Sequence, residues 1–165
     1  MIGGYAANLV EKHSVFMKKI VAYFILVTLV SVACREEKSA LVVFETPEGA
    51  INGYDPVSYY KDKPVKGTPD HTYQWENATW HFSSAENLSL FKAEPEKYAP
   101  QFGGYCAYGM ADGHKAPTQP DAWTIVDDKL YFNYNKEVLA KWRENRDESI
   151  KKAVDNWPTV RKDPF

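Results

Sequence analysis

The sequence predicts a small single domain of the α+β class, built from short antiparallel strands in hairpins, a central helix and two C-terminal helices. Two pairs of β-rich runs each flank a short polar turn, and apolar side chains recur at helical spacing in three other segments. The chain has 165 residues, 44% of them hydrophobic and 25% charged, which is the composition of one globular domain. No repeat or linker divides residues 45–158, so we expect the domain there and a short tail at 159–165.

The first hairpin and the central helix follow each other directly. Tyr73–Trp75 and Thr79–Phe82 are rich in aromatic and β-branched residues around a Glu-Asn-Ala turn, which predicts two paired strands. Ser83 is followed three residues later by Glu86, the pattern of a capping box, so we expect a helix to begin at Ser83. The helix should run for about three turns and stop at Pro95, because proline cannot continue a helix.

The C-terminal part repeats this order of a hairpin followed by helical segments. Ala122–Val126 and Leu130–Tyr134 flank an Asp-Asp-Lys turn and predict a second hairpin. Two amphipathic helices are then expected from apolar side chains that would share one face. These side chains are Val138, Leu139 and Trp142 in the first helix, and Ile150, Ala153, Val154 and Trp157 in the second.

An apolar segment near the N-terminus predicts export. Residues 20–30 are uncharged, but these eleven residues are too few to span a bilayer and match the core of a signal peptide. Lys18 and Lys19 supply the positive flank, and Met17 directly before them is the start that we expect. Residues 1–33 are thus interpreted as an upstream extension and a signal peptide, with cleavage at its end.

The residues at the predicted cleavage point resemble a bacterial lipobox. In that motif a cysteine is lipidated and becomes the mature N-terminus, and Val32-Ala33-Cys34 matches it except that Ser31 stands where leucine is usual. The resemblance implies cleavage before Cys34, a lipid on Cys34, a tether at residues 34–44 and an exported protein anchored to a membrane in the cell envelope or periplasm. An ordinary signal peptide, or a short membrane anchor with an incidental cysteine, is the alternative.

The segment Pro100–Gln119 is the least regular part of the chain and the best place for a functional site. It contains four glycines, and a loop whose backbone can approach a ligand closely often carries function. Its aromatic, thiol, thioether and imidazole side chains are Tyr105, Cys106, Tyr108, Met110 and His114.

Three of these residues form a candidate metal site. Cys106, Met110 and His114 are spaced by four residues, and thiolate, thioether and imidazole suit Cu(I). The glycines argue against one continuous helix, so the set would have to assemble on a loop. His81 is a fourth candidate, expected to face away from its two aromatic neighbours because successive side chains of a strand alternate. Two alternatives stay open for Cys106: a buried, inert thiol beside a strand, and a one-thiol redox centre.

Three stretches of the chain carry a family resemblance. Gly53–Tyr60, Trp80–Ser84 and Phe102–Gly109 occur in this order, and the last reads Phe-Gly-Gly-Tyr-Cys-Ala-Tyr-Gly. They resemble the exported bacterial branch of the YHS-domain family, over a region from Ala50 to Trp157. The resemblance implies a domain that associates with metals.

The resemblance carries over the scaffold and not the cysteine ligands. Metal-handling relatives hold soft ions with cysteines at three positions where this chain has Ser58, Ser83 and Asn87. Hydroxyl and amide groups are poor ligands for a soft metal, so any such binding here would pass through Cys106. Asp55 is expected at a turn or helix start, with its carboxylate accepting backbone N–H groups.

We therefore expect a YHS domain-containing lipoprotein that serves as a binding module for a copper ion or haem. The Gly-rich loop would hold this ligand through Cys106 and the other ligands named above, with Tyr105 and Tyr108 against it. These tyrosines could equally fill the core of a small domain. A one-thiol redox protein, or an interaction module without a ligand, is the alternative, and a metal-handling or redox protein would be the partner.

Other function classes find little support in the sequence. No paired carboxylates, Ser-His-Asp order or phosphate-binding glycine loop is recognisable, so we interpret the protein as a binder more than as an enzyme. The net charge of -2 does not favour a nucleic-acid partner.

Overall fold

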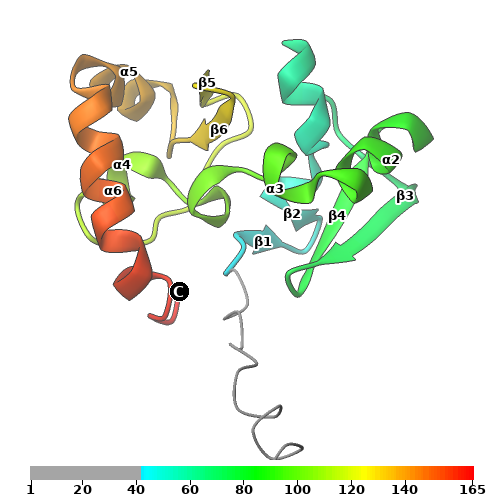
Figure 1. Cartoon of the computed structure of the whole chain (residues 1–165), viewed down its shortest axis with the longest axis horizontal. Coiled ribbons are helices and arrows are strands. Elements are labelled where there is room, and N and C mark those ends of the chain that lie inside the picture. The colour runs from blue at the N-terminus through cyan, green and yellow to red at the C-terminus, as the bar shows by residue number, and fades with distance from the viewer. Residues whose placement is uncertain (1–41) are drawn as a thin grey trace, which may run out of the picture. The chain divides into compact units, whose positions relative to one another are not determined.

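Residues 42–165 are the part of the chain that the computed structural model describes, and they contain three two-stranded antiparallel sheets among short helices (Figure 1). This confirms the predicted α+β class. The predicted signal peptide with its apolar core at 20–30, and the predicted lipid acceptor Cys34, lie outside the described residues. Within the described part, no helix is both long and apolar enough to cross a membrane.

The chain enters the domain through a small hairpin followed by two 3₁₀ helices. Strands β1 (Glu45–Thr46) and β2 (Gly49–Ala50) pair antiparallel, and the helices η1 (Ile51–Gly53) and η2 (Pro56–Lys61) come next. Asp55 caps η2, because its carboxylate accepts a backbone N–H from the first turn of that helix at 2.9 Å. This confirms the role that the sequence predicts for Asp55 at a helix start.

The first predicted hairpin is present, with longer strands and a shorter turn. Strand β3 (Thr68–Trp75) pairs with β4 (Ala78–Phe82), and the turn is Glu76–Asn77. Both turn residues have positive φ, 51° and 62°, as in the two-residue turns whose twist matches that of the strands. The tight turn leaves Ala78 in the strand, where it is buried.

Helix α2 (Ala85–Ala93) begins one residue later than the capping-box pattern predicts. Ser84 is the N-cap, since its hydroxyl accepts a backbone N–H of the first turn at 3.1 Å. The prediction of Ser83 as the cap is wrong because the Ser83 hydroxyl is engaged elsewhere, donating to Asp55 at 2.6 Å. As the proline predicts, α2 ends before the next element, the single-turn helix α3 (Pro95–Tyr98).

The Gly-rich segment contains a 3₁₀ turn, η3 (Gln101–Gly104), and a short helix, α4 (Ala107–Ala111). Gly103 has φ +62°, and a Cβ at this position would collide with the carbonyl oxygen of Val42. Only glycine lets the N-terminal segment pass so closely. Helix α4 ends before His114, in agreement with the expectation that the glycines prevent one continuous helix.

The second hairpin and the two C-terminal helices complete the domain. Strand β5 (Trp123–Val126) pairs with β6 (Lys129–Phe132) across the two-residue turn Asp127–Asp128, so the turn is again one residue shorter than its sequence pattern suggests. Helices α5 (Lys136–Glu144) and α6 (Arg146–Val160) follow, as expected.

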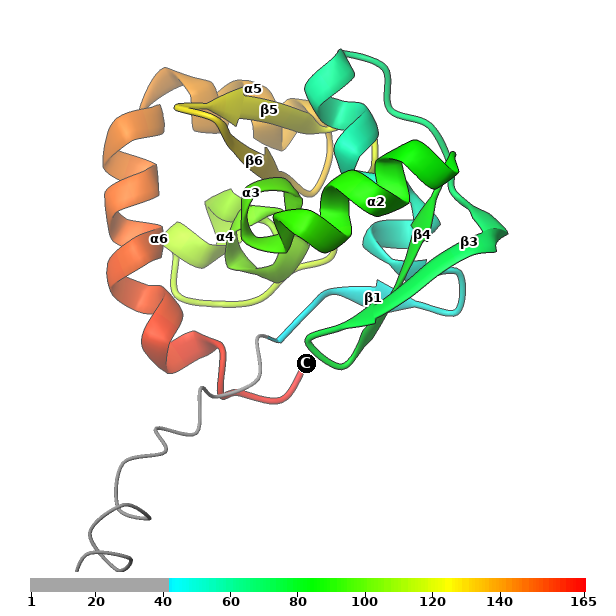
Figure 2. The same ribbon diagram turned by 45° about the vertical axis from the view of Figure 1, so that its right-hand side comes forward.

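Two clusters of buried side chains form the core. The first lies where the β3–β4 hairpin meets α2, and Trp80, Phe82 and Phe91 within it are fully buried. The second lies among α4, β6, α5 and α6, and it includes Met110 and Trp142. Figure 2 shows the β3–β4 hairpin with α2 on one side of the domain and α4, α5 and α6 on the other.

Two expectations about burial are corrected by the structure. Phe44, which the sequence analysis places in the tether, is only 5% exposed, and its ring packs against Tyr105 with the centroids 5.5 Å apart. Val154, expected on the buried face of the last helix, is 54% exposed. The packed face of α6 is centred on the fully buried Ala153, and the next residue along an α-helix points about 100° away from it.

Candidate functional site

Cys106 lies at the start of α4, beside strand β6. Its Sγ accepts the backbone N–H of Gly109 at 3.4 Å, so the thiol caps this short helix. A parallel bridge joins Cys106 to Phe132 of β6, and only 1% of Cys106 is exposed. The environment is thus the one that the alternative of a buried thiol beside a strand describes.

Asn133 lies against this thiol and is itself fully buried. Its Oδ1 accepts the N–H of Tyr108 at 3.2 Å and is 3.7 Å from Sγ of Cys106, so the thiol donates to the amide oxygen. Nδ2 of Asn133 is buried and has no hydrogen-bond partner among residues 42–165. An unsatisfied buried donor of this kind costs about 1–3 kcal/mol, and it marks this loop as incompletely paired.

Burial raises the pKa of the Cys106 thiol above its ordinary value, and the backbone N–H groups of Gly109, Tyr134 and Tyr108 lower it less than burial raises it. The thiol therefore stays protonated at neutral pH. The thiolate, not the thiol, is the nucleophile and the metal ligand. Metal or redox chemistry at Cys106 would first have to remove a proton from a buried site.

The other predicted ligands lie in different surroundings. Met110 is fully buried in the second core cluster. His114 is exposed beyond the end of α4, and its Nε2 is 3.2 Å from the point where a Cβ on Gly109 would lie. His81 belongs to β4, where its ring lies against Gly49 and away from the buried aromatic neighbours, as the alternation predicts. Among the residues that the structure describes, no three His, Cys, Asp or Glu side chains are close enough to hold a metal ion together.

The two tyrosines expected against a ligand lie in different environments. Tyr105 is 3% exposed, and its ring packs against Phe44 and, at a centroid distance of 5.0 Å, against Phe165. Tyr108 is 37% exposed at the surface. Tyr105 thus fills the core, and the pair does not form the walls of one aromatic groove.

The three positions where the resemblance implies cysteines converge on Asp55. Asn87 Nδ2 and Ser83 Oγ each donate to Oδ2 of Asp55 at 2.6 Å, and Ser58 Oγ donates to the carbonyl oxygen of Asp55 at 2.6 Å. Lys61 extends the cluster from the surface, because its Nζ donates to Oδ1 of Asn87 at 2.8 Å. This Asp55 cluster ties η2, the end of β4 and α2 together.

The Asp55 carboxylate is fully buried and accepts four hydrogen bonds. Besides the two side-chain donors, the backbone N–H groups of Val57 and Ser83 each donate to it at 2.9 Å. Three of the four bonds go to Oδ2 and one goes to Oδ1. Because the carboxylate is fully buried among donors from separate elements, the cluster has the chemistry of a structural junction.

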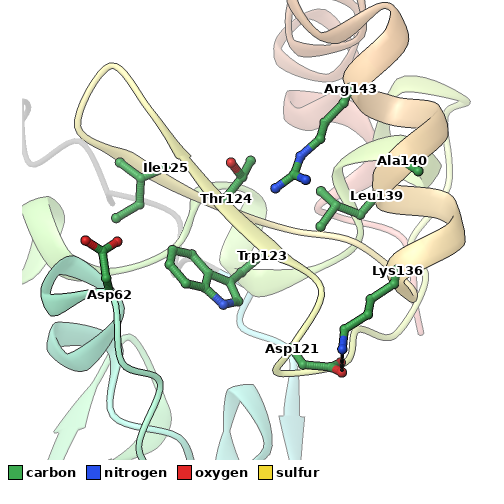
Figure 3. Close-up of a pocket in the computed structure, with 9 residues that line it drawn as sticks. All are labelled: Asp62, Asp121, Trp123, Thr124, Ile125, Lys136, Leu139, Ala140 and Arg143. Atoms are coloured by element: carbon green, nitrogen blue, oxygen red, sulfur yellow. Dashed lines mark ion pairs between the residues drawn. The ribbon is translucent and has the colours of Figure 1, made fainter.

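A groove of about 570 Å³ opens between β5, α5 and the end of η2 (Figure 3). We call it the β5–α5 groove. On the α5 side, the residues in it are spaced i, i+3, i+4 and i+7, so one face of the helix forms the wall. Its lining residues are Asp62, Asp121, Trp123, Thr124, Ile125, Lys136, Leu139, Ala140 and Arg143.

The charges of the β5–α5 groove are distributed unevenly. Lys136 pairs with Asp121 at 2.8 Å at one end, as the dashed line in Figure 3 marks. Arg143 extends from α5 toward Thr124 in Figure 3, and within residues 42–165 its guanidinium has no hydrogen bond or ion pair. Asp62 lies on the other side of β5. Among the described residues of the groove, Arg143 is therefore the cation without a partner that could meet an anionic group.

The sequence does not indicate this groove, because the residues that line it are of ordinary types and none of them stands out as a candidate metal ligand or nucleophile. The only local signals are an uncharged Trp-Thr-Ile-Val strand and a helix that places Arg143 seven residues after Lys136. Neither signal shows that the two elements face each other across an open space.

Comparisons with known proteins add no assignment to this description. No family model, no curated protein and no solved structure matches the chain. The resemblance to the YHS-domain family therefore stays a prediction from the residues that carry it.

Proposed function

We propose that this chain is a binding module, held at a membrane by a lipid on Cys34, and that it binds its ligand in the β5–α5 groove. The observation that carries the proposal is a groove of about 570 Å³ that is lined by the half-buried Trp123 and by the Arg143 guanidinium, which has no hydrogen bond or ion pair within residues 42–165. Ligand pockets of about 300–1,000 Å³ combine apolar and aromatic walls with a few polar groups that fix orientation. The β5–α5 groove has this combination.

The walls of the groove are anchored in the core. The Trp123 ring packs edge-on against Tyr59, with centroids 5.3 Å apart, and Leu139 belongs to the second core cluster. A ligand would find these side chains already in place, which reduces the entropy that binding has to overcome.

Binding of a copper ion or haem at the Gly-rich loop is the second candidate function. The observation in its favour is Nδ2 of Asn133 beside Cys106, which has no hydrogen-bond partner within residues 42–165. This N–H donor could bond to a carboxylate of haem, whereas it could not coordinate copper. Two observations weigh against it: burial raises the pKa of the thiol, and no three His, Cys, Asp or Glu side chains among the described residues are close enough to hold a metal ion together. A one-thiol redox function requires the same deprotonation.

A titration followed by NMR tests the groove. The ¹⁵N-labelled protein is titrated with a panel of small organic anions and short peptides, and we expect the amide signals of Trp123, Thr124 and Arg143 to shift. Arg143→Gln should weaken binding about tenfold or more, because a hydrogen bond to a charged group contributes about 1.5–3 kcal/mol. Lys141→Gln is the matched control, since it removes the same charge from the same helix but faces a different groove.

The outcomes of this titration separate the candidates. Shifts confined to residues around Cys106 would favour the second candidate. If no compound in the panel moves the signals of the β5–α5 groove, the proposed function is wrong.

The membrane anchor is tested by fractionation. We expect the chain expressed from Met17 to sediment with membranes and Cys34→Ala to move to the soluble fraction, because the predicted lipid would be lost. A single acyl chain binds a bilayer only marginally, so stable anchoring needs the several chains of a full lipoprotein modification. Cys106→Ala is the matched control and should stay with membranes. Cofractionation of Cys34→Ala with membranes would contradict the anchor.

A further inference from the structure

Strand β5 presents a free edge. Within residues 42–165 it pairs only with β6, and the turn between them has two residues, Asp127 and Asp128, with φ of 49° and 57°. The residues that flank such a turn exchange hydrogen bonds with each other, and bonded pairs alternate with non-bonded pairs along an antiparallel ladder. Thr124 therefore bonds to β6, and the N–H and C=O groups of Trp123 and Ile125 point away from it.

This free edge opens into the β5–α5 groove. Trp123 and Ile125 project to one face of β5 and Thr124 to the other, and all three line the groove (Figure 3). A space that reaches both faces of a strand lies along its edge. No partner for the outward backbone groups of Trp123 and Ile125 is found within residues 42–165.

The outer edge of β3 is the instructive contrast. That strand carries Pro69 and the charged Asp70, and its pairing with β4 has an irregular register between Thr68 and Thr72. Proline, charge and bulges are the devices that prevent an edge from pairing with another chain. Strand β5 has none of them: it is an uncharged Trp-Thr-Ile-Val segment with a regular register.

We propose, on the basis of the proposed function, that the ligand of the β5–α5 groove is an extended peptide segment of a partner protein that adds to β5 as a further strand and places an acidic side chain beside Arg143. Backbone hydrogen bonds to Trp123 and Ile125 supply affinity, as in other cases of strand addition. The Arg143 guanidinium, which has no partner in the part of the chain that the structure describes, supplies the complementary charge, since arginine binds a carboxylate with two parallel bonds.

The alternation of side chains sets the sequence preference of the peptide. Its residues that face α5 meet Arg143 and the small side chain of Ala140, and those that face the opposite way meet Trp123, Ile125 and Asp62. We therefore expect an acidic residue on the first face, flanked on the second face by apolar or basic residues.

Selection from a displayed library of random decapeptides tests this proposal. The bait is the full chain in mild detergent. We expect enrichment of peptides with Asp or Glu at one position between β-branched or aromatic residues. Ile125→Pro removes the outward N–H at a position where an edge strand tolerates proline, and Arg143→Gln removes the charge. Each should weaken the selected peptides at least tenfold, whereas Lys141→Gln should leave them unchanged.

Hydrogen exchange supplies a second readout in case Ile125→Pro fails to fold. In the wild-type chain, the amides of Trp123 and Ile125 should exchange rapidly and become protected at least tenfold when a selected peptide binds. Peptides that bind without protecting these amides, or that bind Arg143→Gln as well as the wild type, would overturn the proposal.

The remaining outcomes separate this inference from the proposed function. If small organic anions shift the groove signals while no peptide is enriched, the peptide inference is wrong and the groove remains a binding site. If neither class binds, both are wrong. Self-association that protects the same amides in the absence of peptide would replace the partner peptide with a second copy of this chain.

Discussion

Asp55 and Cys106 are both buried polar centres, and they differ in how completely their surroundings are paired. The Asp55 carboxylate accepts bonds from Val57, Ser83 and Asn87, and no polar atom of its cluster is left unsatisfied in the described part of the chain. The Cys106 thiol accepts one hydrogen bond, from the N–H of Gly109, and donates a weak one to Oδ1 of Asn133. Nδ2 of the neighbouring Asn133 has no hydrogen-bond partner in the described part of the chain.

The difference indicates that the Asp55 cluster holds the fold together and that the Cys106 centre contributes less to it. A buried carboxylate with four hydrogen-bond donors fixes the elements around it, since removing a partner leaves a buried charge or donor without a hydrogen bond. A thiol beside an unpaired amide contributes little to the fold and can be changed at modest cost. Neither centre has an open face, and this is why the exposed β5–α5 groove carries the proposed function.

Replacing Asp55 should have the largest effect. We expect Asp55→Ala to lower the free energy of unfolding by about 3–5 kcal/mol, because the buried donors of Ser83 and Asn87 lose their acceptor and η2 loses its cap. Urea unfolding measures the change. Asp70→Ala, at an exposed position, is the control and should cost little. Equal losses for the two variants would show that the cluster is not a structural junction.

Raising the pH should have the second-largest effect on stability, through the ionisation of the Cys106 thiol. The folded pKa of this thiol lies above the ordinary value of 9.0, so its contribution to stability is fully present below pH 9.0 and is lost as the pH rises through the folded pKa. Within that window the loss is about 1.4 kcal/mol per pH unit. Tyr60, whose pKa burial raises to about 12, adds a similar loss above pH 10.0.

The Cys106→Ser variant isolates the thiol in this experiment. It keeps the tyrosines and removes the thiol, so its unfolding free energy should decline less steeply than that of the wild type between pH 9 and 10. Parallel pH profiles for the two proteins would mean that the Cys106 thiol ionises as readily in the folded chain as in the unfolded one.

At neutral pH the substitution of Cys106 should have a moderate effect. We expect Cys106→Ser to cost about 1–3 kcal/mol, from burying a hydroxyl in place of a thiol, and to keep the fold. The same variant tests the second candidate function: if the loop binds Cu(I) or haem, competition with a Cu(I) chelator or haem absorbance should show binding by the wild type and none by Cys106→Ser. Equal binding would remove Cys106 as a ligand.

Replacing Lys61 should have the smallest effect on the free energy of unfolding. Its side chain is half exposed and donates to Asn87 at the surface of the Asp55 cluster. We expect Lys61→Ala to lower the unfolding free energy by at most about 1 kcal/mol, because exposed charge interactions are screened by water. A loss as large as that of Asp55→Ala would mean that the cluster depends on its lysine.

Local patterns in the sequence predict two of the three hairpins and the longer helices, and they place the ends of these elements less well. The β1–β2 hairpin, the 3₁₀ helices, α3 and α4 are not predicted. The choice between Ser83 and Ser84 as the cap of α2 is different, since either hydroxyl could serve locally. Asp55, 28 residues before Ser83 in the chain, decides it by accepting the Ser83 hydroxyl.

Residues that are close together in the chain are enough to predict the α+β class, the order of the predicted hairpins and helices, and the orientation of His81 away from its aromatic neighbours. Contacts between distant segments bring Ser58, Ser83 and Asn87 together at Asp55 and place the Cys106 thiol against an amide 27 residues away. The same packing leaves a groove with a free strand edge between β5 and α5. These features arise from packing between separate segments, whose mutual placement no local pattern encodes.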